Sequence, residues 1–334
     1  MENTLEESFE KAVSVKEGKE EGLEKWLEKS ISDKYINEFD YSKFTDFVVI
    51  GTGGFGTVHK CLWEECKLTV AVKGLNNLGD NVNEDFVKEL RILQKIGYHP
   101  NIIQFYGVTK HPTENYKVIL QYAADGDLRD YLGTNISKLQ WSDKLHVAEE
   151  ITLGLLFLHS NNIIHLDLHS KNILVHKRRM MISDFGLSKQ SDRVSNSASV
   201  VQGHISYIDP QCFIKDSYKR NKKSDIYSLG FILWEITSGQ SPFESFKSRE
   251  QIAIHVFKGE REIPVKDTPK EYVALYKRCW NEDPEKRPDT RPLHDILECF
   301  ISRKELSDLQ KQTIQEIAIK AATDTLNVPN ISST

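Results

Sequence analysis

Residues 163–174 read IIHLDLHSKNIL. Five side chains in this stretch can exchange protons or hold ligands, and Ile and Leu residues surround them: His165, Asp167, His169, Lys171 and Asn172. A buried strand excludes charged groups unless they are paired, and a solvated loop rarely collects so many apolar residues. A polar set inside an apolar frame therefore indicates a functional loop that is held by a packed core.

A second acidic motif follows this stretch closely. Asn172 stands five residues after Asp167, and Asp184, in ISDFGLS, comes 12 residues after Asn172. One carboxylate can accept a proton from a hydroxyl group. The other carboxylate and the amide offer the hard oxygen ligands that Mg²⁺ prefers. This combination is suited to phosphoryl transfer.

A glycine-rich segment, GTGGFGTV, lies upstream at residues 51–58. Its glycines allow the backbone to approach phosphate groups without a clash from a Cβ atom. Alone the motif is weak, because it also opens dinucleotide sites, where a helix follows. Here strand-like residues follow, and Lys73 ends the run VAVK. We therefore favour a loop that covers phosphates, with a lysine on the next strand, over a Rossmann dehydrogenase or an ordinary Gly-rich hairpin.

The composition of the 334 residues is that of a globular protein, 39% hydrophobic and 28% charged with a net charge of −5. Acidic residues outnumber basic ones in the first 40 positions and the rest is close to neutral, so we expect no binding of nucleic acid. The five cysteines form no CxxC pair, which predicts reduced thiols and a cytoplasmic protein. No apolar run reaches the roughly 18 residues that a membrane span needs, so none is expected.

The hydrophobic pattern changes along the chain. Short strand-like runs occupy about residues 44–72, a helical segment follows with Asn83 as its candidate N-cap, and two more strand-like runs come next. After Gly126 the pattern is mostly helical. Strands first and helices afterwards predict an α+β protein, with a small β-rich lobe joined to a larger helical lobe.

The leader of the chain carries apolar residues at helical spacing: Leu23, Trp26, Leu27, Ile31, Tyr35 and Phe39. One face of this helix is available for docking, either within the protein or onto a partner. We divide the chain into an acidic, partly helical leader (1–43), a main domain (44–303), and a C-terminal helix with a frayed tail (304–334).

Together these motifs resemble those of eukaryotic protein kinases, and the resemblance covers about residues 44–303. The motifs follow the family's order and spacing: GTGGFGTV, VAVK, HLDLHSKN, DFG, a degenerate YIDPQ, DIYSLG and EDPEKRP. The mixture looks closest to the tyrosine-kinase-like group. The resemblance implies the bilobal kinase fold, with a β-rich N-lobe containing one main helix at 44–123 and a mostly helical C-lobe at 124–303.

The resemblance also implies catalytic roles for four matching residues. Asp167 would be the catalytic base that orients the substrate hydroxyl. Lys73 would hold the phosphates while Glu89 holds the Lys73 ammonium, and Lys171 would be a further phosphate contact. Phosphoryl transfer needs little covalent help from the protein, so positioning and charge neutralisation should dominate.

Two cofactors are implied, ATP and Mg²⁺, with Mn²⁺ as an alternative metal. The metal ligands would be Asn172 and Asp184. The nucleotide would lie against the glycine loop, the adenine pocket, the gatekeeper Leu120 and the hinge. This set comprises Ile50, Gly51, Thr52, Gly53, Gly54, Phe55, Gly56, Val58, Ala71, Lys73, Leu120, Gln121, Ala123 and Leu174. His165 is better interpreted as a packed structural residue than as an acid or base.

The implied activity is transfer of the ATP γ-phosphate to a hydroxyl of a protein substrate, in signal transduction. Many Ser/Thr kinases have Lys where this chain has His169, tyrosine kinases tend to have a cation at Lys171, and His204 replaces the expected Thr. We favour Ser/Thr and keep tyrosine or dual specificity as alternatives. A pseudokinase scaffold that binds nucleotide without turnover is the alternative from another class, and the complete catalytic set disfavours it.

Two departures from the family pattern concern regulation and stability. Leu166 replaces the Arg that normally pairs with a phosphorylated activation loop, and leucine has neither charge nor donor. Loop phosphorylation is therefore not expected to act through this position. Gln211 stands where a Glu would pair with Arg287, which predicts a softer anchor in the C-lobe.

Overall fold

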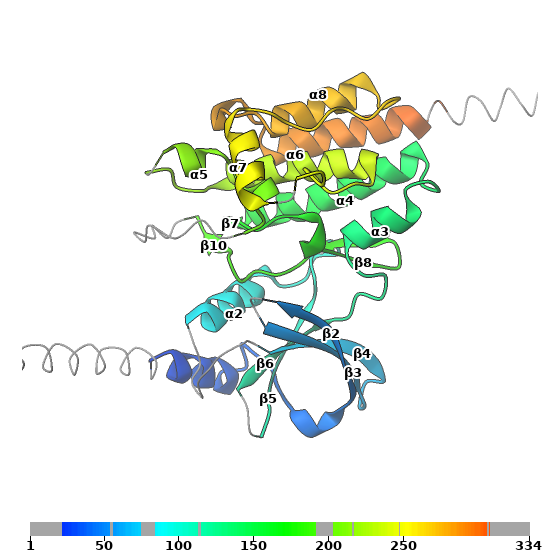
Figure 1. Cartoon of the computed structure of the whole chain (residues 1–334). Coiled ribbons are helices and arrows are strands. Elements are labelled where there is room, and N and C mark those ends of the chain that lie inside the picture. The colour runs from blue at the N-terminus through cyan, green and yellow to red at the C-terminus, as the bar shows by residue number, and fades with distance from the viewer. Residues whose placement is uncertain are drawn as a thin grey trace, which may run out of the picture.

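The computed structural model describes residues 22–307 except for 54–55, 75–83, 113–114, 192–202, 216, 247 and 306. Figure 1 shows a β-sheet lobe and a helical lobe, one above the other. The small lobe is built from the first part of the chain and the helical lobe from the rest, so the predicted α+β, bilobal arrangement is confirmed. Among the described residues no helix combines the length and the apolarity that crossing a membrane requires.

The N-lobe contains a six-stranded sheet in the order β1-β5-β6-β4-β3-β2. All neighbouring strands are antiparallel except β1 and β5, which are parallel. The strands are β1 (Glu38–Asp40), β2 (Phe44–Gly53), β3 (Gly56–Trp63), β4 (Leu68–Gly74), β5 (Phe105–Lys110) and β6 (Tyr116–Gln121). The glycine-rich segment joins β2 to β3, where Gly53 faces Gly56. The prediction of a glycine loop between two strands is therefore confirmed.

One side of this sheet has a core of its own. Val70 and Val72, two residues apart on β4, are both fully buried, as the twofold side-chain period of a strand requires. The Trp63 ring packs edge-on against Phe39, with ring centroids 4.5 Å apart, and against Phe44. Aromatic packing thus joins the leader strand β1 to the rest of the sheet.

Helix α2 (Glu84–Ile96) is the main helix of the N-lobe. It begins with Glu84 and Asp85, which favour the positive end of the helix dipole. Phe86, Leu90 and Leu93 are all buried and form its inner face, as the sequence predicts. Asn83, the candidate N-cap, lies outside the described residues.

The leader is helical over residues 22–32 and continues into β1. Leu27 is fully buried, and Ile36 is 2% exposed. β1 pairs with β5 with Glu38 opposite Val108. The sheet therefore starts before residue 44, where the main domain was expected to begin, and the division of the chain there stays a prediction.

The C-lobe is organised around α6, which is buried along nearly its whole length. A helix with apolar residues on all sides is typical of the centre of a lobe. The helices are α3 (Leu128–Asn135), α4 (Trp141–Ser160), α5 (Gln211–Ile214), α6 (Lys222–Ser238), α7 (Arg249–Phe257) and α8 (Lys270–Cys279), followed by a helical run at 290–305.

Short elements connect these helices and carry the polar motifs. Two small strand pairs lie at the junction of the lobes: β7 (Ile163–Ile164) with β10 (Lys189–Gln190), and β8 (Ile173–His176) with β9 (Arg179–Ile182). The 3-10 turns are η1 (Tyr41–Lys43), η2 (Ser170–Asn172), η3 (Ile205–Tyr207) and η4 (Pro284–Lys286). The opening stretch IIHLDLHSKNIL thus runs from β7 through a loop and η2 into β8, which explains its apolar ends.

Candidate active site

A buried lysine joins the two lobes. Lys73 Nζ, on β4, lies 2.8 Å from Glu89 Oε1 on α2 and 3.0 Å from Asp184 Oδ1, which follows β9. Burial lowers the pKa of Lys73, but the charges of Glu89 and Asp184 outweigh that effect and raise it above the usual value. The ammonium therefore stays charged. Glu89 is 3% exposed, so it is not the solvated helix residue that it would be on local sequence grounds alone.

Asp167 lies in the loop between β7 and η2. The Asn172 amide donates to the Asp167 backbone oxygen at 2.9 Å and to its carboxylate at 3.3 Å. Burial raises the pKa of Asp167, but contacts with His169, the charge of His165 and the His204 N–H lower it below the ordinary value. An ionised carboxylate in a fixed place can accept a hydrogen bond from a hydroxyl and orient it.

Gly203 and His204 lie against this carboxylate. A Cβ atom on Gly203, whose φ is +119°, would lie 2.8 Å from Asp167 Oδ1. The rings of His169 and His204 are neighbours, with centroids 5.6 Å apart. Burial, followed by nearby positive charge, lowers the pKa of His204 to about 4, so this ring is neutral at pH 7. Glycine is required here because a side chain would collide with Asp167.

Asp225 of α6 fixes the backbone of the Asp167 loop through hydrogen bonds. Leu166 has a φ of +68°, a left-handed conformation that is costly for a leucine. Asp225 accepts hydrogen bonds from the backbone N–H groups of His165 and Leu166, each at 2.8 Å. His165 is fully buried and its ring packs against Phe185 with centroids 5.4 Å apart, so its interpretation as a packed residue is confirmed. The strained loop is thus stabilised by a buried carboxylate.

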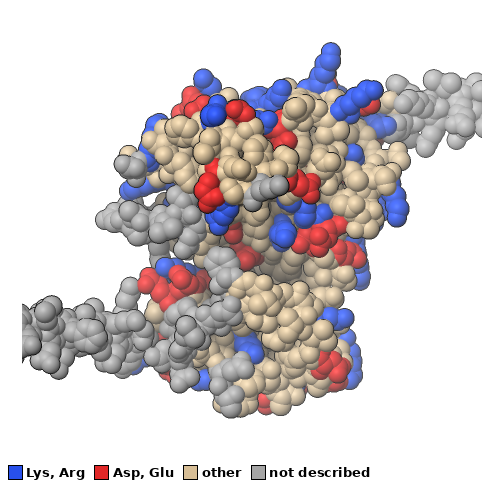
Figure 2. Space-filling model, in the orientation of Figure 1, with Lys and Arg blue, Asp and Glu red and all other residues tan. Residues whose placement is uncertain are grey.

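The residues expected to meet the nucleotide line the junction of the lobes. β3 and β4 place Val58 opposite Lys73, and β4 and β6 place Ala71 opposite Leu120. Ala71 is buried, while Val58 and Leu174 are half-buried, which leaves apolar surface for a flat ring. Figure 2 shows a recess between the lobes, with charged side chains along its C-lobe side.

The expected residues differ in how exposed they are. Lys171 is exposed on η2, and Ile50 is 46% exposed on β2. Gly54 and Phe55, at the tip of the glycine loop, lie outside the described residues. The other residues expected in the glycine loop and hinge lie on β2, β3 and β6 and just after β6: Gly51, Thr52, Gly53, Gly56, Gln121 and Ala123.

A second buried network, which the sequence reasoning missed, lies beneath the loop. Arg129 of α3 donates to Glu235 of α6 at 2.9 Å and to Ser170 Oγ at 2.6 Å. Tyr207 of η3 also donates to Glu235. Burial raises the pKa of Glu235 to about 7 although the Arg129 charge opposes it. The sequence indicates this network only through Glu235, an acidic residue inside the apolar run of α6.

The prediction that Gln211 takes the place of the acidic partner of Arg287 and softens this anchor is wrong. Arg287 forms a bidentate ion pair with Asp209, Nη1 to Oδ2 at 2.6 Å and Nη2 to Oδ1 at 2.9 Å. The Gln211 amide instead donates to the backbone oxygen of Glu282 at 3.1 Å. Asp209 stands two residues before the expected position and supplies the charge that Gln211 lacks. The anchor is therefore charge-assisted, not softened.

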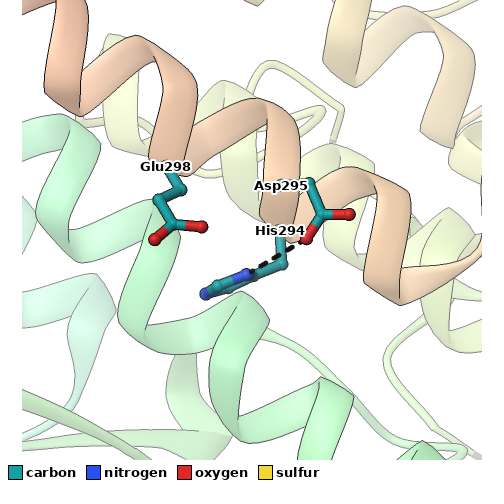
Figure 3. A group of neighbouring side chains, drawn as sticks. All are labelled: His294, Asp295 and Glu298. Carbon is teal, nitrogen blue, oxygen red and sulfur yellow. Dashed lines mark ion pairs between the residues drawn. The ribbon is translucent and has the colours of Figure 1, made fainter.

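A group of possible metal ligands lies elsewhere on the C-lobe. Figure 3 shows His294, Asp295 and Glu298 on the helical run 290–305, with their ligand atoms all within 4.8 Å of one another. His294 Nδ1 lies 3.8 Å from Asp295, and its Nε2 lies 3.9 Å from Glu149 of α4. Asp295 and Glu298 are exposed, as solvated carboxylates commonly are without a metal ion. This group belongs to the charged surface and not to the junction of the lobes.

The two lobes and the groups at their junction define a protein kinase domain. Residues 46–297 match the family described as protein tyrosine and serine/threonine kinase. The match covers most of the chain, and the chain therefore belongs to this family. The expectation drawn from the motifs is confirmed, including the likeness to the tyrosine-kinase-like group.

Three curated relatives show the range of the similarity. The chain is 32% identical over 251 residues to a probable LIM domain-containing serine/threonine-protein kinase of Dictyostelium discoideum. It is 32% identical over 259 residues to the serine/threonine-protein kinase CTR1 of Arabidopsis thaliana and 33% over 254 residues to the tyrosine-protein kinase TXK of Homo sapiens. Each alignment covers 75% of this chain but only 38%, 31% and 47% of the respective relative. The chain thus spans less than half the length of these relatives.

Proposed function

We propose that this protein is an ATP- and Mg²⁺-dependent protein kinase that phosphorylates Ser or Thr hydroxyls of a protein substrate. The observation that carries the proposal is the position of Lys73, whose ammonium contacts both Glu89 and Asp184 in a buried site. The paired Lys73 supports a cationic contact for phosphates, and the ionised Asp167 supports orientation of the acceptor hydroxyl.

The residues at the junction fit both cofactors. Asn172 and Asp184 offer an amide oxygen and a carboxylate, the hard donors that suit Mg²⁺. Lys73 and the glycine loop would hold the phosphates of ATP, and Val58, Ala71 and Leu174 would contact its base. When bound, the metal ion would neutralise developing charge on the transferred group.

Within this proposal, Asp167, Lys73, Glu89 and Lys171 keep the roles expected from the motifs, and residues 44–303 form the kinase domain. The acceptor class rests on the serine/threonine kinases among the relatives, while the tyrosine kinase relative keeps tyrosine or dual specificity as the alternative. A cytoplasmic location rests on the five free cysteines. The contacts of the leader helix support intramolecular docking in preference to a partner.

The test is incorporation of labelled phosphate from ATP into general protein substrates and into the protein itself, followed by identification of the phosphorylated residues. Wild type should incorporate label only with Mg²⁺ or Mn²⁺. Asp167→Asn and Lys73→Met should each lose activity by about a hundredfold or more, because they remove positioned charge at the reacting groups.

Thermal unfolding of the same variants serves as the control for folding. Equal incorporation by wild type and Asp167→Asn would contradict the proposal. Metal-dependent nucleotide binding without incorporation would favour the pseudokinase alternative. Label found mainly on tyrosine would replace the Ser/Thr assignment.

A further inference from the structure

The segment that precedes the first long strand contacts the helix that carries Glu89. We call residues 22–40 the N-terminal segment; it comprises the helical run 22–32 and β1. Figure 1 shows this helical run beside α2. The Arg91 guanidinium of α2 lies over the Trp26 ring, 4.6 Å from its centroid. Leu27 is fully buried in the same core cluster as Phe86 and Leu90 of α2. The N-terminal segment and α2 thus share one packed interface.

The other end of the N-terminal segment is fixed to the sheet. The Asn37 carbonyl accepts a hydrogen bond from the Val108 N–H at 2.8 Å, and β1 then pairs with β5. Gly107 has a φ of +153°, and a Cβ atom there would lie 2.3 Å from the Asn37 oxygen. Only glycine permits this close approach. The N-terminal segment is therefore fixed to the sheet at β1 and contacts α2 through its helical run.

Glu89 and Arg91 lie on opposite sides of α2. Two residues correspond to a rotation of about 200° around an α-helix. α2 is therefore held on one side by Trp26, through Arg91, and on the other side by Lys73, through Glu89. A rotation or outward shift of α2 would disturb both contacts together, so the two are geometrically coupled.

The pair of Lys73 and Glu89 depends strongly on this placement. Both side chains are less than 9% exposed, and a buried ion pair loses its advantage when its partners separate, because each charge has already left water. Leu166 offers no cation through which a loop phosphate could stabilise the active arrangement. α2 also contacts β10 of the C-lobe, and from within the N-lobe the N-terminal segment contacts it through Trp26.

We propose that the N-terminal segment positions α2, and that Trp26 and Leu27 act through α2 to keep Glu89 against Lys73. The proposal rests on the kinase activity proposed above. Trp26 is a positioning residue: it contacts Arg91, which transmits its effect to α2. Competence for phosphoryl transfer is thus determined in cis by a segment that lies before the residues matching the kinase family.

The test compares Trp26→Ala, Trp26→Phe and Tyr35→Ala in the full chain. Trp26→Ala should lower kcat by about tenfold or more, since a misplacement of about 1 Å in a positioning group can cost about a hundredfold. Trp26→Phe keeps an aromatic face for Arg91 and should retain most of the activity. Tyr35 is 68% exposed in the same segment, so Tyr35→Ala is the matched control and should behave as wild type.

A double-mutant cycle separates positioning from a general loss of structure. In a Glu89→Gln background, Trp26→Ala should cause no further loss of kcat, because the contact through which it acts is already broken. An equal further loss in that background would overturn the proposal, as would full activity of Trp26→Ala. Amide hydrogen exchange should increase in α2 of Trp26→Ala and stay unchanged in α6.

Two outcomes distinguish failure of this inference from failure of the proposed kinase function. Inactive wild type would contradict the kinase activity itself, and the exchange experiment would still decide whether the N-terminal segment holds α2. Active wild type with additive losses would leave the kinase activity intact and would reject only the role of the N-terminal segment.

Discussion

Arg287 and Asp209 form a two-pronged ion pair in the C-lobe, and both side chains are fully buried. Removal of one partner would leave the other charge without compensation in a site that water cannot reach. Asp209→Ala should therefore reduce the free energy of unfolding by about 3–5 kcal/mol. Urea unfolding followed by fluorescence measures this change.

Gln211→Ala is the matched control for Asp209→Ala. It removes one hydrogen bond, from Gln211 to the Glu282 carbonyl, and should cost about 1 kcal/mol. If the two variants were equally destabilised, the buried ion pair of Asp209 and Arg287 would contribute no more to stability than the single hydrogen bond of Gln211.

Glu235 should make stability depend on pH near neutrality. Its pKa is raised from 4.5 to about 7, chiefly by burial, so the folded protein binds a proton that the unfolded chain has already released. The resulting stabilisation is complete below the unfolded pKa and is lost as the pH rises through about 7. Glu235→Gln cannot ionise, and its stability should fall less than that of wild type over this range.

Thermal unfolding over a series of pH values tests this prediction. Glu244→Gln, at an exposed position, is the control and should follow wild type. Parallel curves for wild type and Glu235→Gln would show that the buried acid does not titrate in this range.

His169 should influence the pH at which kcat/KM falls on the acid side. It helps to lower the pKa of Asp167 against the opposing effect of burial. In His169→Ala the pKa of Asp167 should rise, and the acid limb of kcat/KM should move to higher pH. His146→Ala changes a half-exposed histidine on α4 and is the control. An acid limb that stays in place would mean that His169 does not influence Asp167.

Leu166 predicts that kinase activity does not depend on a phosphate contact at this position. Its side chain carries no donor, and its backbone is fixed by Asp225 and by Arg220, which donates to the Leu166 oxygen at 3.1 Å. Protein treated with phosphatase should therefore keep the activity of mock-treated protein. A large loss on dephosphorylation, with phosphosites absent after treatment, would show that a loop phosphate acts through another contact.

Short motifs made much of the fold and site predictable. The spacing from Asp167 to Asn172 and Asp184 is local, and each motif lies at the end of a strand or in a turn that the hydrophobic pattern marks. The two lobes were predictable because the strand-like runs come first in the chain and the helical runs follow. The roles of the site residues are proposals. Their placement was predictable because each motif lies at the end of a strand or in a turn where the two lobes meet.

Long-range partners were not predictable in this way. Arg129 and Glu235 are 106 residues apart, and Arg287 and Asp209 are 78 apart, so packing and not local pattern decides which charges meet. Gln211 was preferred as the partner of Arg287 because of its place in the motif. The turn after η3 presents Asp209 instead, and this geometry has no signature in the sequence.

The parallel pairing of β1 with β5 also affects how the domain can be isolated. β1 covers the edge that β5 would otherwise expose, and unpaired edges are templates for association with other chains. A fragment that begins at residue 46, where the family match begins, would lose this cover together with the buried Leu27. We expect such a fragment to aggregate, whereas one that begins before residue 22 should remain monodisperse.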